Sequence, residues 1–90
     1  MKLYVIHDHK AEAYTMPQAS RNNETMKREL TQLKGTIYQD FPSDYTLYEI
    51  GSYDEITATL VPYDKHRPVC SLADIFLSDQ RAADQNDLPL

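Results

Sequence analysis

The sequence predicts a small α+β domain: an antiparallel four-stranded sheet in the order ββαββ, one helix packed on one face, and a short C-terminal helical turn. Three observations lead to this fold class. The chain opens with a run rich in β-branched and aromatic residues. One amphipathic segment then has apolar residues at helical spacing. Two further strand-like runs flank an acidic turn. We place this domain in residues 1–77.

The N-terminal segment predicts a β-hairpin. The run "KLYVIHD" (Lys2–Asp8) is typical of a central strand, because apolar and aromatic side chains occupy both of its faces. A short polar turn at residues 8–10 follows. The run "AEAYTM" (Ala11–Met16) is then expected to return as the second strand and to stop at Pro17, which has no N–H for the ladder.

Residues Asn23–Lys34 predict the helix. Asn22 is a suitable N-cap, and a lysine followed by glycine is a common helix end. Met26, Leu30 and Leu33 recur at i, i+4 and i+7 and form a narrow apolar stripe. We expect this stripe to pack on the first and third strands, through Leu3 or Val5 and through Leu47 or Ile50.

The middle of the chain predicts a second hairpin. Its strands are Tyr45–Tyr53 and Thr57–Val61, with an acidic turn at residues 54–56. Gly51 inside the first of these strands indicates a bulge or a sharp bend. Phe41, in the connection before the hairpin, is expected to enter the core.

The C-terminal part predicts little regular structure. A loop is expected from Pro62 to Ser71, and Ser71 can cap a short helix over residues 72–77. Residues 78–90 lack any periodicity and predict a flexible acidic tail.

The charge of the chain is acidic overall but unevenly distributed. The formal net charge is −5, yet residues 1–35 carry six Lys or Arg against four Asp or Glu, and residues 36–90 carry three against ten. Non-specific nucleic-acid binders usually have a basic balance, because phosphate neutralisation supplies most of their affinity. Charge therefore argues against such a role, unless the basic N-terminal half and base stacking provide the affinity.

The cysteine content and the absence of targeting segments indicate the cellular compartment. Cys70 is the only cysteine, so no internal disulfide can form and nothing indicates an oxidising environment. The first residues have no apolar run suited to a signal peptide, and no later segment could span a bilayer. We expect a cytosolic protein with no membrane partner.

The sequence offers no convincing catalytic or metal-binding pattern. His7 and His9 would share a face if the first strand continued through both, but His66 lies far along the chain and two ligands do not complete a zinc site. Cys70 has no paired base nearby, and two glycines leave no phosphate-binding loop. We expect no enzyme, no metal and no cofactor.

The chain is rich in tyrosine, with seven tyrosines and no tryptophan. Along the third strand, alternation places Leu47 on one face and Tyr48 on the other. Since one helix covers one face of the sheet, the open face is expected to keep at least one tyrosine near water. Such a ring can stack on nucleic-acid bases, or it can simply suit a half-buried strand with a solvated hydroxyl.

Two stretches, "MKLYVIHDHKAEAY" and "DYTLYEIGSYDE", resemble the small nonstructural protein of the gokushovirus branch of the Microviridae, which are single-stranded-DNA bacteriophages. The resemblance covers most of residues 1–62. It departs after Thr57, where Ala58 stands in place of an expected glycine. The positions that carry it are Met1, Lys2, Tyr4, Asp8, Lys10, Ala11, Asp44, Tyr45, Leu47, Tyr48, Ile50 and Gly51.

The resemblance implies a role in viral DNA replication, in the cytoplasm of a bacterial host. Such proteins are regarded as binding single-stranded DNA, or as acting in the switch to single-strand synthesis and packaging. On this hypothesis, tyrosines stack on bases and cations of the N-terminal half meet phosphates. The candidate nucleic-acid-binding residues are Lys2, Tyr4, Lys10, Arg21, Lys27, Arg28, Lys34 and Tyr48.

A second hypothesis makes the protein an adaptor. Its acidic half would bind a viral replication protein or a procapsid component without contact to DNA. In either case we expect a homo-oligomer, most simply a dimer, because a thin core rich in tyrosine leaves apolar surface to cover.

Overall fold

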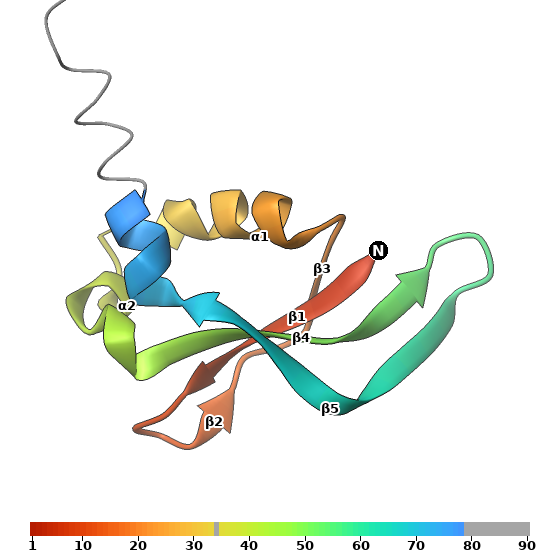
Figure 1. Cartoon of the computed structure of the whole chain (residues 1–90), viewed down its shortest axis with the longest axis horizontal. Helices are drawn as coiled ribbons and strands as arrows, with labels where there is room; N and C mark the ends of the chain where they lie inside the picture. Colours follow the sequence, from red (N-terminus) through yellow and green to blue (C-terminus); the bar gives the residue numbers. More distant parts are fainter. Residues whose placement is uncertain (34, 79–90) are drawn as a thin grey trace, which may run out of the picture.

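The structure confirms the α+β class with an antiparallel sheet. It is a computed structural model that describes residues 1–33 and 35–78. Within these residues the sheet has five strands in the order β2-β1-β4-β5, with β3 also pairing with β1. Figure 1 shows α1 and the helical residues 72–78, drawn in blue, on the same side of this sheet. The elements are β1 (Lys2–Asp8), β2 (Ala13–Tyr14), β3 (Gln18–Ser20), α1 (Asn23–Leu30), α2 (Ile37–Asp40), β4 (Tyr45–Asp54), β5 (Thr59–Ser71) and the helical residues 72–78.

The first predicted hairpin is only partly right. The strand β1 has the predicted bounds, but its neighbour is divided into β2 and β3, so the four-strand ββαββ order is not what the structure shows. Thr15 still exchanges hydrogen bonds with Ile6. Pro17 cannot donate to the ladder, and pairing with β1 resumes only at Gln18.

The helix α1 begins at Asn23 as predicted, but it ends at Leu30 instead of continuing to Lys34. The Asn22 side chain accepts a hydrogen bond from the Thr25 amide at 2.8 Å, as expected of an N-cap. Met26 and Leu30 are buried, and Leu33 packs on the core from a 3₁₀ turn at Thr31–Leu33. Lys34, the predicted last residue, lies outside the described residues.

The sheet residues under α1 differ in part from those predicted. Leu47 is in the core as expected, but Leu3, Val5 and Ile50 are not part of this cluster. Side chains alternate along β1, so the face that meets α1 carries Tyr4 and Ile6 instead.

The connection between α1 and β4 is more structured than predicted. It contains α2 and a 3₁₀ turn at Pro42–Asp44. Phe41, expected in the core, is 68% exposed. Tyr38 of α2 takes the inner position, with its ring 4.8 Å from that of Tyr45.

The largest correction concerns residues 62–71, which were expected to form a loop. They continue β5 to Ser71, through both Pro62 and Pro68. An edge strand tolerates proline, because one of its sides has no partner to receive an N–H. The predicted short helix follows, and the Ser71 hydroxyl accepts from the Ala73 amide at 3.1 Å. Apart from Ser78, which is helical, the predicted tail lies outside the described residues.

The hairpin of β4 and β5 bends sharply where the two strands change register. Glu49 pairs with Arg67, but Gly51 pairs with Pro62, so β5 carries extra residues between these two points. The bend is visible in Figure 1 at the corner of β5. It confirms the irregularity predicted at Gly51.

Gly51 is required at this bend. A Cβ there would lie 2.6 Å from the Val61 carbonyl oxygen and 3.2 Å from the Pro62 Cα atom, both in the backbone of β5. We expect Gly51→Ala to lower the free energy of unfolding by about 1–2 kcal/mol, because the strands must move apart. Urea unfolding of Gly51→Ala and of the wild type measures this difference. An unchanged Gly51→Ala midpoint would contradict the close approach.

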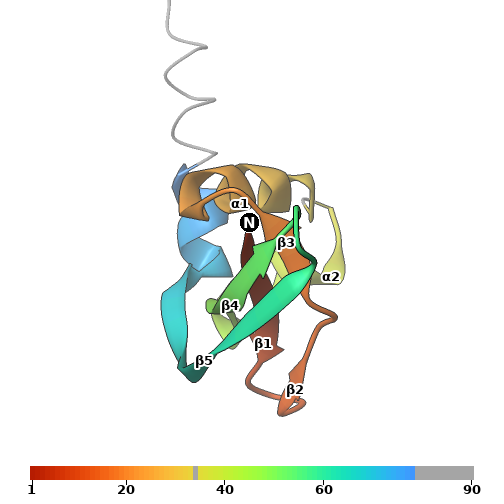
Figure 2. The ribbon, with the colours of Figure 1, turned by 90° about the vertical axis from the view of Figure 1, so that its right-hand side faces the viewer.

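Beyond Tyr53 the hairpin leaves the body of the protein. The strand β1 pairs with β4 as far as Ser52, and Met1 exchanges two backbone hydrogen bonds with Tyr53, at 2.8 and 2.9 Å, so residues 54–61 form a two-stranded arm. Figure 1 shows this arm extending past the N-terminal end of α1, and in Figure 2 the arm points towards the viewer. Its turn holds Ala58 at φ 58°, in the left-handed region that favours glycine. Three of its aliphatic side chains are exposed: Ile56, Leu60 and Val61.

Candidate nucleic-acid interface

The sheet face opposite α1 carries a continuous group of aromatic rings. We call His7, Tyr14, Tyr48 and His66 the aromatic platform; they come from β1, β2, β4 and β5. The rings of His7 and Tyr14 are stacked at 4.4 Å with an interplanar angle of 25°. The Tyr48 ring lies 6.2 Å from that of His7 and 6.3 Å from that of His66. The Tyr14 and His66 rings, at 5.6 Å, close the group.

His9 extends the platform at one end. Its ring lies 4.5 Å from that of His7, and its Nε2 atom is 2.6 Å from the Thr46 hydroxyl. The backbone also fixes this residue, since the His9 amide donates to the Asp44 carbonyl at 2.9 Å. All three histidines of the chain therefore meet on one face.

The platform is open to solvent, and a buried side chain lies beside it. Tyr14 and His66 are exposed, and His7 and Tyr48 are half-buried. Val5, the cross-strand partner of Tyr48, is buried although it lies on the face away from α1. The sequence prediction of a partly exposed Tyr48 behind a buried Leu47 is thus confirmed.

Sequence reasoning found part of this site and missed the rest. It singled out Tyr48, and it noted that His7 and His9 could share a face. It missed Tyr14 and His66, because their positions depend on pairing across the sheet. The segment containing His66 had been predicted as a loop, so no local signal placed that ring beside Tyr48.

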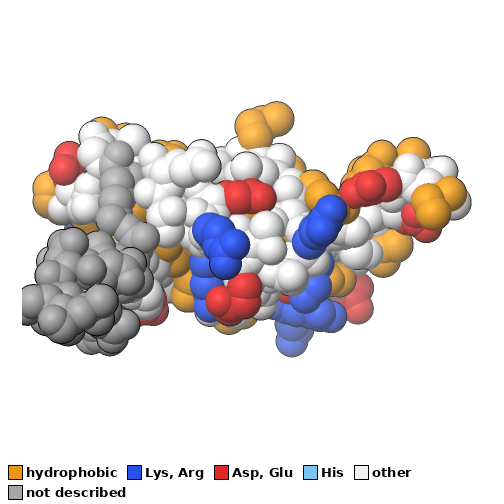
Figure 3. Space-filling model, turned by 90° about the horizontal axis from the view of Figure 1, so that it is seen from above, with side chains coloured by type: hydrophobic (Ala, Val, Ile, Leu, Met, Phe, Trp, Pro, Cys, Tyr) orange, Lys and Arg blue, Asp and Glu red, His pale blue; other side chains and the backbone are white. Residues whose placement is uncertain are grey.

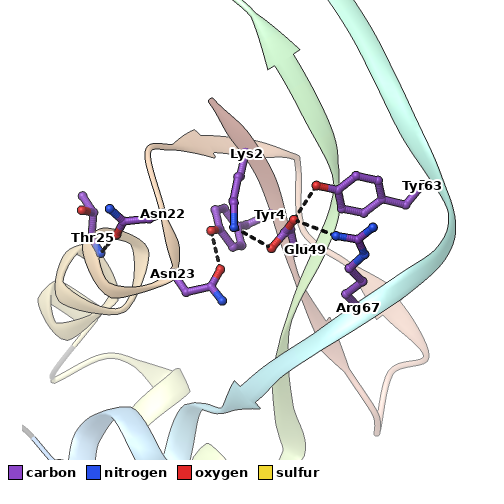
Figure 4. A network of polar contacts seen from close by, with 8 residues as sticks. All are labelled: Lys2, Tyr4, Asn22, Asn23, Thr25, Glu49, Tyr63 and Arg67. Carbon is purple, nitrogen blue, oxygen red and sulfur yellow. Dashed lines mark hydrogen bonds and ion pairs between the residues drawn. The ribbon is translucent and has the colours of Figure 1, made fainter.

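Tyr4 is not available to a ligand, which corrects its place among the candidate DNA-binding residues. It is 0% exposed, and its hydroxyl donates a 2.6 Å hydrogen bond to the Asn23 side chain at the start of α1 (Figure 4). The ring lies on the core side because β1 alternates Tyr4 and Ile6 inward.

A cluster of polar side chains around Glu49 links β5 to the rest of the sheet, on the same side as α1. The buried Glu49 carboxylate pairs with Lys2 at 3.5 Å and with Arg67 at 3.8 Å, and it accepts a hydrogen bond from the Tyr63 hydroxyl. The Arg67 guanidinium also lies 3.8 Å above the Tyr63 ring. Figure 4 shows these side chains converging on Glu49. The Lys2 charge, a candidate for phosphate contact, is therefore engaged within the protein.

The other candidate cations do not gather on the platform. Lys27 and Arg28 belong to α1, on the other side of the sheet, and Lys27 pairs with Glu24 at 3.4 Å. Figure 3, which views that side, shows basic and acidic side chains interspersed. Arg21 is exposed between β3 and α1, and Lys10 lies in the turn directly after His9. Lys34 lies outside the described residues.

The described residues offer little for metal or nucleophilic chemistry. Within residues 1–33 and 35–78, no group of three or more His, Cys, Asp or Glu side chains is arranged to hold a metal ion. Burial raises the pKa of the Cys70 thiol, which is opposite to the shift that activates a nucleophile. None of the helices in the same residues is long and apolar enough to cross a membrane.

Removing the Tyr4 hydroxyl is expected to reduce stability. Burial and the nearby Glu49 carboxylate raise the pKa of Tyr4 from 10.0 to about 12. Its contribution to stability is therefore complete below about pH 10 and is lost as the pH rises through about 12. We expect Tyr4→Phe to cost about 0.5–1.5 kcal/mol at pH 7 and to flatten the loss of stability between these two pH values. Denaturant unfolding at pH 7, 10 and 11.5 measures both effects, and a variant that follows the wild-type profile would contradict the prediction.

The fold and this face define a small α+β protein that presents a group of aromatic rings to solvent. Residues 1–75 match a family described as Phage ORF5 protein, and the chain belongs to that family. Neither the curated proteins nor the solved structures gave a match.

Proposed function

We propose that this phage protein binds single-stranded DNA without catalysing a reaction. The observation that carries the proposal is the aromatic platform on the open face of the sheet. Aromatic rings on a sheet stack with any base, because every base has a π-face, and each stacked base contributes about 1–3 kcal/mol. A duplex hides these faces, so an exposed platform favours single strands.

We place this activity in phage DNA replication in the cytoplasm of the bacterial host. Membership of the Phage ORF5 protein family supports a phage role. The finer assignment, to the gokushovirus branch of the Microviridae and to the switch towards single-strand synthesis or packaging, rests on the resemblance of residues 1–62.

A titration of the full-length protein against a labelled oligothymidine tests the proposal. Fluorescence anisotropy at two salt concentrations should show binding that weakens as salt rises, because any phosphate contact releases counterions. A duplex of the same length is the control and should bind more weakly. Absence of binding at low ionic strength would contradict the proposal.

The adaptor remains the second candidate, and the arm is the observation that favours it. Its Ile56 is 95% exposed and stands next to the acidic Asp54 and Glu55. Exposed aliphatic groups on a projecting hairpin are typical of surfaces that contact another protein. In Figure 3 the arm forms one end of the molecule, with hydrophobic side chains at its surface. If the protein does not bind single-stranded DNA but does bind another protein, the result would support this candidate.

We also propose that the protein forms a homodimer through the arm. A second copy can cover Ile56, Leu60 and Val61 with the same residues across a two-fold axis. Sedimentation at tens of micromolar should show a species of twice the 10.4 kDa chain mass, and Ile56→Asp should return it to the monomer. A wild-type protein that sediments only as the monomer would refute this proposal.

A further inference from the structure

The positive charge on the platform depends on histidine. The platform and its extension contain His7, His9 and His66, the only histidines of the chain. Histidine is the side chain whose charge ordinarily changes between about pH 5 and 8. Positive charge on an imidazole of this face would therefore lie directly beside the stacking rings.

The rings next to the histidines are aromatic. His7 faces His9, Tyr14 and Tyr48, while His66 faces Tyr14 and Tyr48. Within residues 1–33 and 35–78, no ion pair joins a histidine to a carboxylate. Several charged residues are close to the histidines in the sequence: Asp8, Lys10 and Glu12 in and after β1, and Asp64, Lys65 and Arg67 in β5. Asp44 is also close, because its carbonyl accepts from the His9 amide.

Two of those charged groups are already engaged. The Asp8 carboxylate accepts from the amides of Lys10 and Ala11, at 3.0 and 3.1 Å. Arg67 points to Glu49 on the other face. A nucleic-acid strand lying on the platform would thus meet imidazole rings before it met the cations of α1.

We propose that the platform binds single-stranded DNA in its protonated form, with the histidines supplying the charge that meets the phosphates. The inference rests on the proposed function and adds its regulation: affinity rises as the pH falls from about 8 to about 6. Each histidine protonated on binding adds one positive charge to the acidic chain, and that charge lies beside the stacking rings. This resolves how an acidic protein could hold a polyanion.

The first experiment compares affinities for oligothymidine at pH 6 and pH 8, at one low ionic strength. A contact between two exposed charges raises a binding constant by up to about fivefold. Contacts from two or three histidines should therefore raise the affinity at pH 6 by roughly tenfold to a hundredfold. The salt dependence should steepen by about 0.7 for each phosphate neutralised on a single strand. Binding with the same affinity at both pH values would overturn the inference while leaving the proposed function intact.

Variants separate local charge from net charge. The double variant His7→Gln, His66→Gln keeps polar side chains that cannot take up protons, and it should lose most of the pH dependence. Adding Gln32→His, at an exposed position of the 3₁₀ turn after α1, restores one titrating charge away from the platform. If this third change also restores the pH dependence, net charge rather than the platform is responsible and the inference fails.

A measurement on the wild type decides the matter even if the double variant does not fold. Because binding and protonation are linked, DNA that prefers the protonated platform must draw protons from the buffer. Calorimetric titrations at pH 7 in two buffers of different ionisation enthalpy should show uptake of a fraction of a proton or more per strand bound. Binding without proton uptake would refute the inference. No binding at any pH would instead refute the proposed function itself.

Discussion

Leu30→Ala is expected to lower the free energy of unfolding by about 2–5 kcal/mol, which is a large part of the stability of so small a domain. Leu30 is 4% exposed in the core between α1 and the sheet, in the cluster that includes Leu47 and Phe76. Truncation removes buried apolar surface and leaves a cavity that the short helix cannot collapse to fill. Thermal and urea unfolding, followed by circular dichroism, measure the loss.

Leu60→Ala is the matched control for this change. The substitution is chemically the same, but Leu60 is 62% exposed on the arm. Its effect on a monomeric sample should stay within about 0.5 kcal/mol. A Leu30→Ala protein that melts within a degree or two of the wild type would contradict the packing of α1 described above.

Tyr48→Ala should weaken binding to oligothymidine by about 1–3 kcal/mol, with little change in its salt dependence. Tyr48 is the half-buried centre of the platform, between His7 and His66, and its ring offers stacking but no charge. Anisotropy titrations at several salt concentrations give both quantities. Tyr53→Ala, a change of the same size near the arm, should leave the affinity unchanged. Equal losses in the two variants, both confirmed as folded, would contradict a specific role for the platform.

Salt dependence also shows which side of the protein the DNA follows. The sequence predicts that Lys27→Ala or Arg28→Ala reduces the salt slope by up to about one. Both residues lie on α1, across the sheet from Tyr48. If the DNA contacts only the platform, the salt slope should be unchanged in these two variants. It should be smaller in Lys10→Ala, because Lys10 directly follows His9 in the chain. A reduced slope in Arg28→Ala would mean that the DNA also passes over α1.

The arm and the platform, for which we propose different functions, lie at the two ends of one hairpin. The β4 and β5 strands supply Tyr48 and His66 where they pair with the rest of the sheet, and they supply Ile56 and Leu60 where they leave it. Gly51 lies at the change between these parts, where the backbone of β5 leaves no space for a Cβ atom. DNA binding and dimerisation can therefore be tested separately, by substitutions on opposite sides of Gly51.

By itself the sequence determined the elements whose signals are local. The β-branched run of β1, the Asn22 cap and apolar stripe of α1, the alternation of Leu47 and Tyr48, and the Ser71 cap each depend on residues a few positions apart. These predictions were confirmed, since no distant partner is needed to specify them.

Only the tertiary structure decided the composition of the site. Tyr4 and Tyr48 look alike in the sequence, but the inward position of Tyr4 and its hydrogen bond to Asn23 remove it from solvent. His66 reaches the platform because β5 continues through two prolines, which an edge strand tolerates. Pairing between strands that are distant in the chain creates these positions, and a local pattern of residues does not contain that information.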